Sequence, residues 1–157
     1  MTPTSLVKVV SGGQAGADQA GWRAARAAGL ATGGWMPRGF ETEDGPRPEF
    51  AAEFGAMAVA GGYRERTQAN ARDSDATAWF GDPNTPGGLA TLRACRALGR
   101  PAFLVRAGRT RPSELAAWLA GRPVAVLNVA GCRESEEPGI GARVERFLAA
   151  ALRRLDP

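Results

Sequence analysis

Short apolar runs alternate with longer helical stretches along this chain, and several of the runs end at glycine. Leu6–Val10 is closed by Ser11-Gly12-Gly13, and the Ala-rich stretch after it ends at Gly29, a typical helix end. Further strand-like runs lie at 76–80, 102–105 and 124–129, and further helical stretches at 63–73, 89–98, 114–119 and 140–155. The alternation predicts an α/β fold, an open and mostly parallel sheet with helices on both faces.

The segment between the first helix and residue 63 has a weaker pattern. Residues 31–48 are rich in glycine and proline and predict a long structured loop, with a short strand at Gly33-Gly34-Trp35. Residues 49–58 are compatible with one or two turns of helix. The chain shows no internal repeat and no linker composition, so we expect a single domain over residues 1–157.

The sequence contains no histidine, which narrows its chemistry. Ser-His-Asp and Cys-His triads, His-ligated zinc or haem, and imidazole acid–base steps are excluded. Cys95 and Cys132 are too far apart for a Cys-x-x-Cys motif, and Lys8 is the only lysine available for a Schiff base. We therefore assign neither a catalytic residue nor a metal ligand.

The charge of the chain is modest and dispersed. Lys plus Arg number 20 and Asp plus Glu 16, which gives a formal net charge of +4 without any basic block. We therefore expect no specific nucleic-acid partner. No apolar run approaches the roughly 20 residues of a membrane helix, and the first residues do not have the pattern of a signal peptide. We expect a cytoplasmic protein with no membrane partner.

Ligands of open parallel sheets bind at the carboxyl ends of the strands, so the residues after each strand form the candidate site. Glycine-rich turns there let an anion approach the backbone, and a helix N-terminus supplies N–H groups. The candidates are Gly12, Gly13, Gln14, Gly16 and Asp18 in one turn, Gly87, Gly88 and Thr91 in another, and Gly131 and Arg133 in a third. They predict a site for a phosphate-bearing ligand or another oxyanion, although any strand-to-helix turn favours glycine.

A polar run at 66–75 precedes the strand at 76–80. On a helix, Arg66, Asn70 and Asp73 share one face. The run could be an ordinary solvated helix face. Alternatively, Asp73 and Asp75 could be buried partners of an arginine and orient it toward a ligand. The candidate ligand-binding residues of this run are Arg66, Asn70, Asp73 and Ser74.

Three residues in loops complete the candidates. Arg38 lies in the long loop, which could cover the site, and Trp35 beside it could stack on a ligand or belong to the core. Cys132 could be a ligand-facing thiol or a small buried side chain.

Several motifs together resemble one protein family. They are Ser11-Gly-Gly-Gln-Ala-Gly-Ala-Asp18, Gly34-Trp-Met-Pro-Arg-Gly39, Glu43-Asp-Gly45, Arg66-Thr-Gln-x-Asn70, Arg72-Asp-Ser-Asp-Ala-Thr77, Gly87-Gly-x-Ala-Thr91 and Leu127-Asn-Val-Ala-Gly131. The set resembles the molybdenum (cofactor) carrier proteins, a circularly permuted branch of the Rossmann-like superfamily with the lysine-decarboxylase-like, cytokinin-activating proteins. The resemblance implies a Rossmann-like fold, a homo-oligomer (dimer or tetramer), and a site for molybdenum cofactor, molybdate or a nucleotide-like ligand.

The chain departs from the cytokinin-activating relatives at two places. Their Pro-Gly-Gly-x-Gly-Thr-x-x-Glu motif is matched by 86–94, with Ala90 in place of a glycine and Ala94 in place of the catalytic glutamate. Cys132 stands where the resemblance leads us to expect proline. The anion-binding half of the motif is kept, whereas the phosphoribohydrolase reaction loses support.

Three functions are therefore weighed. The leading one is a carrier that holds a small anionic ligand at the glycine turns, with Arg38, Arg66 or Arg133 adding charge-assisted bonds and Asn70, Asp73 and Asn128 orienting its polar parts. The second is a nucleotide-cleaving hydrolase with Asp18, Asp73, Asp75 or Glu134 as its base. The third is a nucleotide-sensing module that works through partners.

Overall fold

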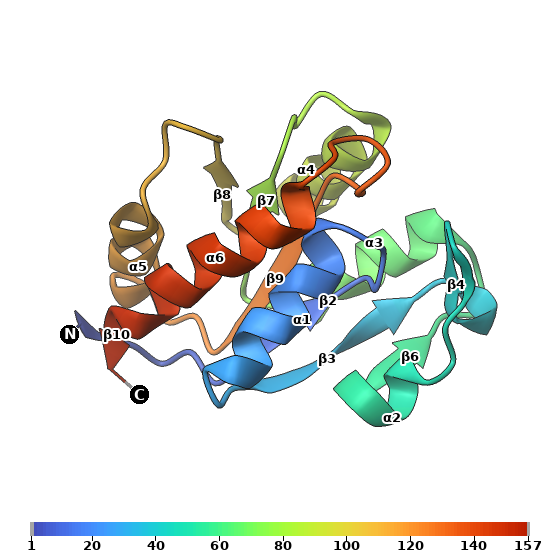
Figure 1. Ribbon diagram of the computed structural model, residues 1–157, viewed down its shortest axis with the longest axis horizontal. Helices are drawn as coiled ribbons and strands as arrows, with labels where there is room; N and C mark the ends of the chain where they lie inside the picture. Colours follow the sequence, from blue (N-terminus) through green and yellow to red (C-terminus); the bar gives the residue numbers. More distant parts are fainter. Residues whose placement is uncertain (1, 157) are drawn as a thin grey trace.

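The computed structural model describes residues 2–156 and contains a central sheet flanked by helices (Figure 1). The sheet has six parallel strands in the order β6-β3-β2-β9-β7-β8. They are β2 (Lys8–Ser11), β3 (Ala31–Met36), β6 (Ala56–Ala58), β7 (Ala76–Phe80), β8 (Ala102–Val105) and β9 (Val126–Gly131). The register places Val10 beside Gly33 of β3 and Asn128 of β9. The predicted α/β, Rossmann-like fold is confirmed.

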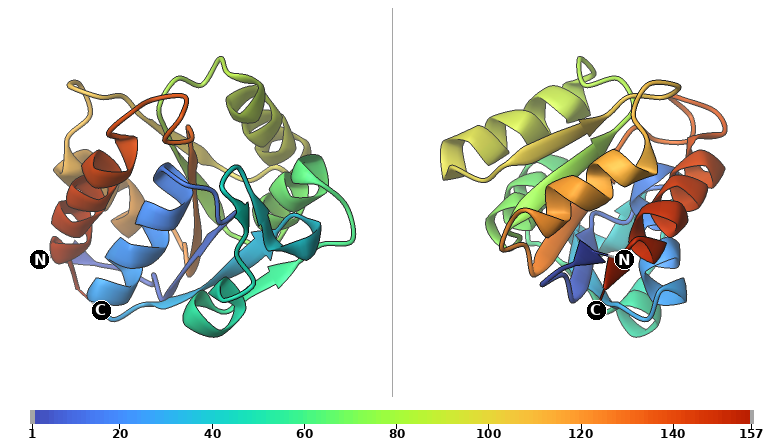
Figure 2. Two further views of the ribbon diagram at one scale, coloured as in Figure 1. Left: turned by 45° about the vertical axis from the view of Figure 1, so that its right-hand side comes forward. Right: turned by 90° about the vertical axis from the view of Figure 1, so that its left-hand side faces the viewer.

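Helices cover both faces of the sheet (Figure 2). On one face, α1 (Ala17–Ala27) packs on α6 (Ile140–Arg153), which packs on α5 (Pro112–Ala120). On the other, α3 (Tyr63–Arg72) packs on α4 (Pro86–Leu98). A helix that joins two parallel strands runs back antiparallel to them, so α1, α3 and α4 begin at the carboxyl edge of the sheet.

Small residues let the helices approach the sheet closely. At Gly21 in α1, an added Cβ would lie 2.7 Å from Cγ1 of Val129 in β9. A second cluster lies under the short helix α2 (Phe50–Phe54), where the rings of Trp22 and Phe54 stack with their centroids 4.8 Å apart. The main core lies between the sheet and the face of α1, α5 and α6; its largest fully buried side chains include Leu115, Leu119, Leu127, Ile140 and Leu148.

The expectation for residues 31–58 was wrong in part. The helical turn is confined to α2, and Gly55 with φ +74° ends it, so that 56–58 form the edge strand β6 instead. Ala56–Ala58 has no β-branched residue and becomes a strand only because it pairs with β3. The predicted long loop holds the 3₁₀ turn η1 (Arg38–Phe40) and a hairpin of β4 (Glu41–Thr42) and β5 (Gly45–Pro46).

The chain ends also differ from expectation. The last helix stops at Arg153, and β10 (Leu155–Asp156) pairs with β1 (Thr2–Pro3) in a separate parallel ladder. Within residues 2–156, no helix combines the length and apolar character that a bilayer crossing requires.

The strand order reverses direction near the middle of the sheet. The chain proceeds outward from β2 to β3 and β6, crosses to β7 and β8, and returns to place β9 between β2 and β7. Open α/β sheets bind ligands in the crevice at such a reversal, beyond the carboxyl ends of the strands. The fold therefore places a candidate site where the turns after β2, β7 and β9 meet.

Candidate functional site

A cleft of about 380 Å³ lies at this position, within the size range of small-molecule sites. The turn after β2, the start of α3, the start of α4 and the loop after β9 each contribute to its wall. The sequence-predicted residues that line it are Gln14, Asp18, Arg66, Gly87, Thr91, Gly131 and Arg133. The structure thus brings together residues from four of the predicted segments.

The glycine turn after β2 is shaped by close contacts. Gly13 and Gly16 have φ of +82° and +113°, which other residues rarely adopt. Gly16 pairs with Arg133 as an isolated bridge, and the Glu134 N–H donates to Ala15 O at 2.9 Å. These bonds fix the loop after β9, and with it Arg133, beside the turn.

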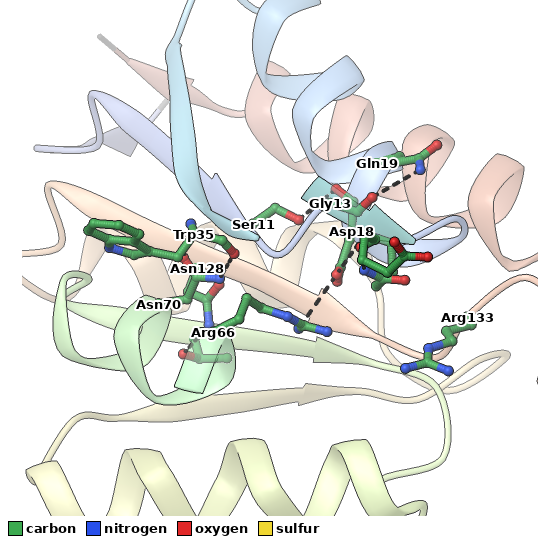
Figure 3. Close-up of polar contacts among 12 residues, drawn as sticks. Ser11, Gly13, Asp18, Gln19, Trp35, Arg66, Asn70, Asn128 and Arg133 are labelled. Atoms are coloured by element: carbon green, nitrogen blue, oxygen red, sulfur yellow. Dashed lines mark hydrogen bonds and ion pairs between the residues drawn. The ribbon is translucent and has the colours of Figure 1, made fainter. Parts of the chain in front are cut away.

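Arg66 packs directly against this turn. A Cβ at Gly12 would lie 2.5 Å from Arg66 Nη1, so glycine leaves the space that the guanidinium occupies. The Arg66 side chain is only 12% exposed, and its Nη1 lies 3.8 Å from Oδ2 of Asp18 (Figure 3). Arg66 Nε is buried and has no hydrogen-bond partner within the described part of the chain.

Two guanidinium groups flank one aromatic ring at the cleft. The Cζ atoms of Arg66 and Arg133 lie 5.4 and 4.7 Å from the centroid of Tyr63, the first residue of α3. Cation–π contact holds both cations without neutralising them. The site therefore concentrates positive charge from segments 67 residues apart in the sequence.

Asp18 supplies the opposite charge in the same place. Burial raises the pKa of Asp18 above its usual range; Arg66, the Gln14 N–H and Arg133 lower it in part. Burial likewise lowers the pKa of Arg66, against the influence of Asp18. For both groups, the effect of desolvation on the pKa is thus larger than the opposing effect of the ion pair. A single buried carboxylate faces two guanidinium groups, and an incoming anion would relieve this imbalance.

The turn that leads into α4 forms the facing wall. Thr85 caps the helix by accepting the Gly88 N–H at 3.1 Å, and Pro86 opens its first turn. Gly88 is packed against the backbone of Pro83, whereas the Gly87 N–H has no hydrogen-bond partner within residues 2–156. This N–H is an anion donor at a helix N-terminus.

Four other candidates lie elsewhere, with their polar groups already bonded. Asn70 accepts the Trp35 N–H at 2.8 Å and donates to Trp35 O at 2.9 Å, which clamps α3 onto β3. Asp73 bonds to Arg72 and to Nε1 of Trp35 at the far end of α3, and Ser74 donates to Ala71 O. Asn128 donates to Oγ1 of Thr77 between β9 and β7. None of the four lines the cleft.

The three loop candidates also lie outside the cleft. Arg38 is exposed outside the cleft, and Trp35 lies at a separate groove between α3 and α4. Cys132 is buried and donates weakly to Asp82 O, and burial raises the pKa of its thiol, so the buried-filler alternative is favoured.

The carboxylates considered as the base of a hydrolase also divide into those that lie outside the cleft and one that lines it. Asp75 accepts the N–H groups of Ala125 and Val126 at the amino ends of the strands. Glu134 accepts those of Gly139 and Gly141 at the start of α6. Of the four carboxylates considered, Asp18 is the one that lines the cleft. Ala94 lies in the groove between α3 and α4, one helical turn beyond Thr91.

Sequence reasoning missed eight residues that line the cleft: Tyr63, Arg64, Thr67, Trp79, Pro86, Ala90, Ala130 and Glu136. Trp79 lies in the strand 76–80, from which no candidate was named, and Glu136 is part of the loop that carries Arg133. Tyr63 could have been suspected because it precedes Arg66 by three helical positions. Residues 2–156 contain no cluster of three His, Cys, Asp or Glu that could hold a metal ion.

The fold and the site define a class, an α/β protein of Rossmann-like architecture with a cationic cleft at the reversal of its strand order. Within this class, the chain belongs to the circularly permutated YpsA SLOG family, whose family model matches residues 9–152. The suspected relationship is thereby confirmed.

A solved structure with the same fold supports this assignment. It is the crystal structure of a protein from Syntrophus aciditrophicus SB named "putative molybdenum carrier protein". The two chains share 28% sequence identity with a TM-score of 0.87, and the match covers 95% of this chain and 96% of the other. A comparison with curated proteins finds no match.

Proposed function

We propose that this protein binds and carries a small anionic ligand in the cleft. The observation that carries the proposal is the pair of guanidinium groups of Arg66 and Arg133, both held against Tyr63 beside one buried carboxylate. Concentrated positive charge in a partly desolvated cleft favours an anion strongly, because charge-assisted hydrogen bonds strengthen away from bulk water.

The site residues divide into those that contact the ligand and those that shape the cleft. Arg66, Arg133 and the Gly87 N–H would hold the anion, and Thr91 lies beside them on α4. The glycines of the turns allow the close packing within the protein that shapes the cleft; they are Gly12, Gly13, Gly16, Gly88 and Gly131. Asn70 acts through Arg66, because its bonds to the Trp35 backbone fix the helix that carries this arginine.

The relative from Syntrophus aciditrophicus suggests the cargo. Its name supports a ligand of the molybdenum type for this chain also: molybdenum cofactor, molybdate or a related phosphate-bearing molecule. The described residues offer arginines and N–H groups rather than a metal-ligand cluster, so recognition would fall on the oxyanion or phosphate group. A homo-oligomer and a cytoplasmic location remain predictions.

The test combines cargo analysis with a matched pair of variants. Protein purified from cells supplied with molybdate is analysed for molybdenum and pterin, and affinities are measured by isothermal titration calorimetry. Arg133→Gln should weaken binding about 10- to 100-fold, since a hydrogen bond to a charged group contributes about 1.5–3 kcal/mol. Arg109→Gln changes the charge equally at an exposed loop outside the cleft and should have no effect. Equal affinities of the two variants would contradict the proposal.

One observation keeps a nucleotide-cleaving activity as a second candidate. Asp18 is a buried carboxylate of raised pKa in a cleft, and such groups recur as acid–base catalysts. Incubation with nucleoside monophosphates and ADP-ribose, followed by chromatography, tests this activity. Turnover that is lost in Asp18→Asn would support an enzyme, and no turnover across the panel would exclude it for those substrates.

A further inference from the structure

The cleft contains hydrogen-bond acceptors as well as cations. Asp18 is 3% exposed; its Oδ2 accepts the Gln14 N–H at 3.2 Å and pairs with Arg66, while Oδ1 accepts no hydrogen bond from residues 2–156. The Asp18 carboxylate holds Arg66 in place, but it also repels a bare oxyanion that is seated beside it, because like charges repel at this distance.

Gln14 is the second acceptor. Its side chain is buried and lines the cleft, and its Nε2 donates to Glu41 O at 2.9 Å. Glu41 O can only accept, so it fixes the amide with Oε1 turned the other way. Oε1 then has no donor within the described part of the chain. An unsatisfied buried acceptor is costly, and native sites that keep one commonly satisfy it with a ligand donor.

These acceptors lie beside the cations that hold the anion. Arg66 contacts Asp18 directly, and the Gln14 N–H bonds to the same carboxylate oxygen. A ligand seated on Arg66 and Arg133 therefore brings its neighbouring atoms to Asp18 and Gln14. Those atoms must be N–H or O–H donors to match.

We propose that Asp18 and Gln14 make this cleft selective for an anion that also carries a hydrogen-bond donor, namely a phosphate with a P–OH, N–H or O–H group, over fully ionised oxyanions. The inference rests on the proposed anion-binding function and refines it. At neutral pH, molybdate and sulfate present acceptors alone and face the Asp18 carboxylate without a proton between them. A phosphate group with a second pKa near 6 can keep a proton, and an organic phosphate can present donors from its organic part.

The donor can come from the phosphate itself or from an attached group, and the probes separate these sources. Sodium molybdate and sodium sulfate carry no donor at neutral pH, sodium phosphate carries its own, and guanosine monophosphate adds the N–H groups of a planar ring. Sites built to bond a ligand N–H or O–H reject analogues that lack it by large factors. We expect phosphate or guanosine monophosphate to bind the wild-type protein at least tenfold more tightly than molybdate and sulfate.

Asp18→Asn keeps the shape and removes the charge, and it should bring molybdate to within about threefold of phosphate. Asp44→Asn removes the same charge from the exposed hairpin turn and should leave the selectivity unchanged. Gln14→Leu removes the unpartnered acceptor and should also reduce the difference in affinity between phosphate and molybdate. This variant tests the donor requirement independently if Asp18→Asn folds poorly.

The outcomes separate the two proposals. If molybdate or sulfate binds wild type as tightly as both phosphates, or if Asp18→Asn and Gln14→Leu both keep the full selectivity, the donor requirement is overturned and anion binding stands. If none of the four probes binds at millimolar concentration, anion binding fails and the selectivity proposal falls with it.

Discussion

Asn70 offers the sharpest test of how the site is built. β2 leaves the sheet after Ser11, while β3 continues to Met36, so the edge of β3 that faces β2 loses its partner there. Met36 O accepts the Val59 N–H on the β6 side, and successive residues of a strand point their peptide groups to opposite sides. The peptide groups of Trp35 therefore point toward the gap, where the Asn70 amide takes the place of a strand.

Replacing Asn70 with leucine removes both bonds while nearly keeping the volume. It leaves the Trp35 N–H and C=O without partners, and each such group costs about 1–3 kcal/mol when buried. Trp35 is partly exposed, which allows some rehydration. We expect the free energy of unfolding to fall by about 2–4 kcal/mol, measured by urea unfolding followed by tryptophan fluorescence.

The variant N70D tests the same contact through the protonation state of the carboxyl group that it introduces. An ionised carboxylate can accept from the Trp35 N–H but repels Trp35 O, whereas a protonated one donates to it, so the fold raises the pKa of the new group. Its share of stability is then fully present below the unfolded pKa of about 3.9 and lost as pH rises through the folded pKa. N70D should resemble wild type at pH 4 and N70L at pH 8.

Two results would refute this reasoning. A loss below about 0.5 kcal/mol in N70L would show that the clamp is dispensable, since surface substitutions reach that size. A difference between N70D and wild type that does not shrink on acidification would show that the donation to Trp35 O is not what Asn70 supplies.

Three further predictions concern the site and its supports. Gly12→Ala should displace the Arg66 guanidinium and weaken anion binding at least tenfold with little loss of stability. Gly131→Ala should lower the melting temperature markedly, because the added methyl group meets rigid backbone. Calorimetry measures the first effect and thermal unfolding the second. Glu134→Gln should lower the free energy of unfolding by about 1 kcal/mol at pH 7. The N–H groups of Gly139 and Gly141 lower the pKa of Glu134. The difference in stability between the variant and wild type is therefore present above pH 4.5 and should vanish on acidification below the lowered pKa. Phosphate binding near pH 7 should take up protons, because the ionised Asp18 carboxylate favours the form of the phosphate that keeps a P–OH; titrations in buffers of different ionisation enthalpy should show uptake in wild type and clearly less in Asp18→Asn.

The glycine turns could be predicted from the sequence because their signals are local. Gly12 and Arg133 lie within two residues of the end of an apolar strand, Gly87 lies where the loop after the strand 76–80 enters a helix, and the carboxyl ends of parallel strands share one edge. Edge strand β6 could not be predicted in this way, since three residues of Ala-Met-Ala gain their conformation from β3 alone. The contact of Tyr63 with Arg66 could be suspected from their helical spacing, but its contact with Arg133 could not, because it forms only in the folded chain.

The polar run at 66–75 shows a rule that sequence reasoning could have applied. Arg66 and Asn70 do share the face of α3 that meets the sheet, as the spacing predicts. However, a helix after a parallel strand begins at the carboxyl edge and runs away from it. The first turns of α3 therefore reach the ligand, and Asp73 and Ser74 at its end lie at the opposite edge of the sheet.

The same geometry explains why anchor and cation lie on one helix. Asn70 fixes α3 to the β3 backbone, and Arg66 lies one turn nearer the cleft, about 6 Å along the axis. A guanidinium on a long, flexible side chain gains precision when its helix cannot slide, its path is bounded by Gly12, and Asp18 holds its end. The buried polar contacts of the site thus order Arg66 when the chain folds, before any ligand arrives. Binding then costs less conformational entropy, so that more of the contact energy contributes to affinity.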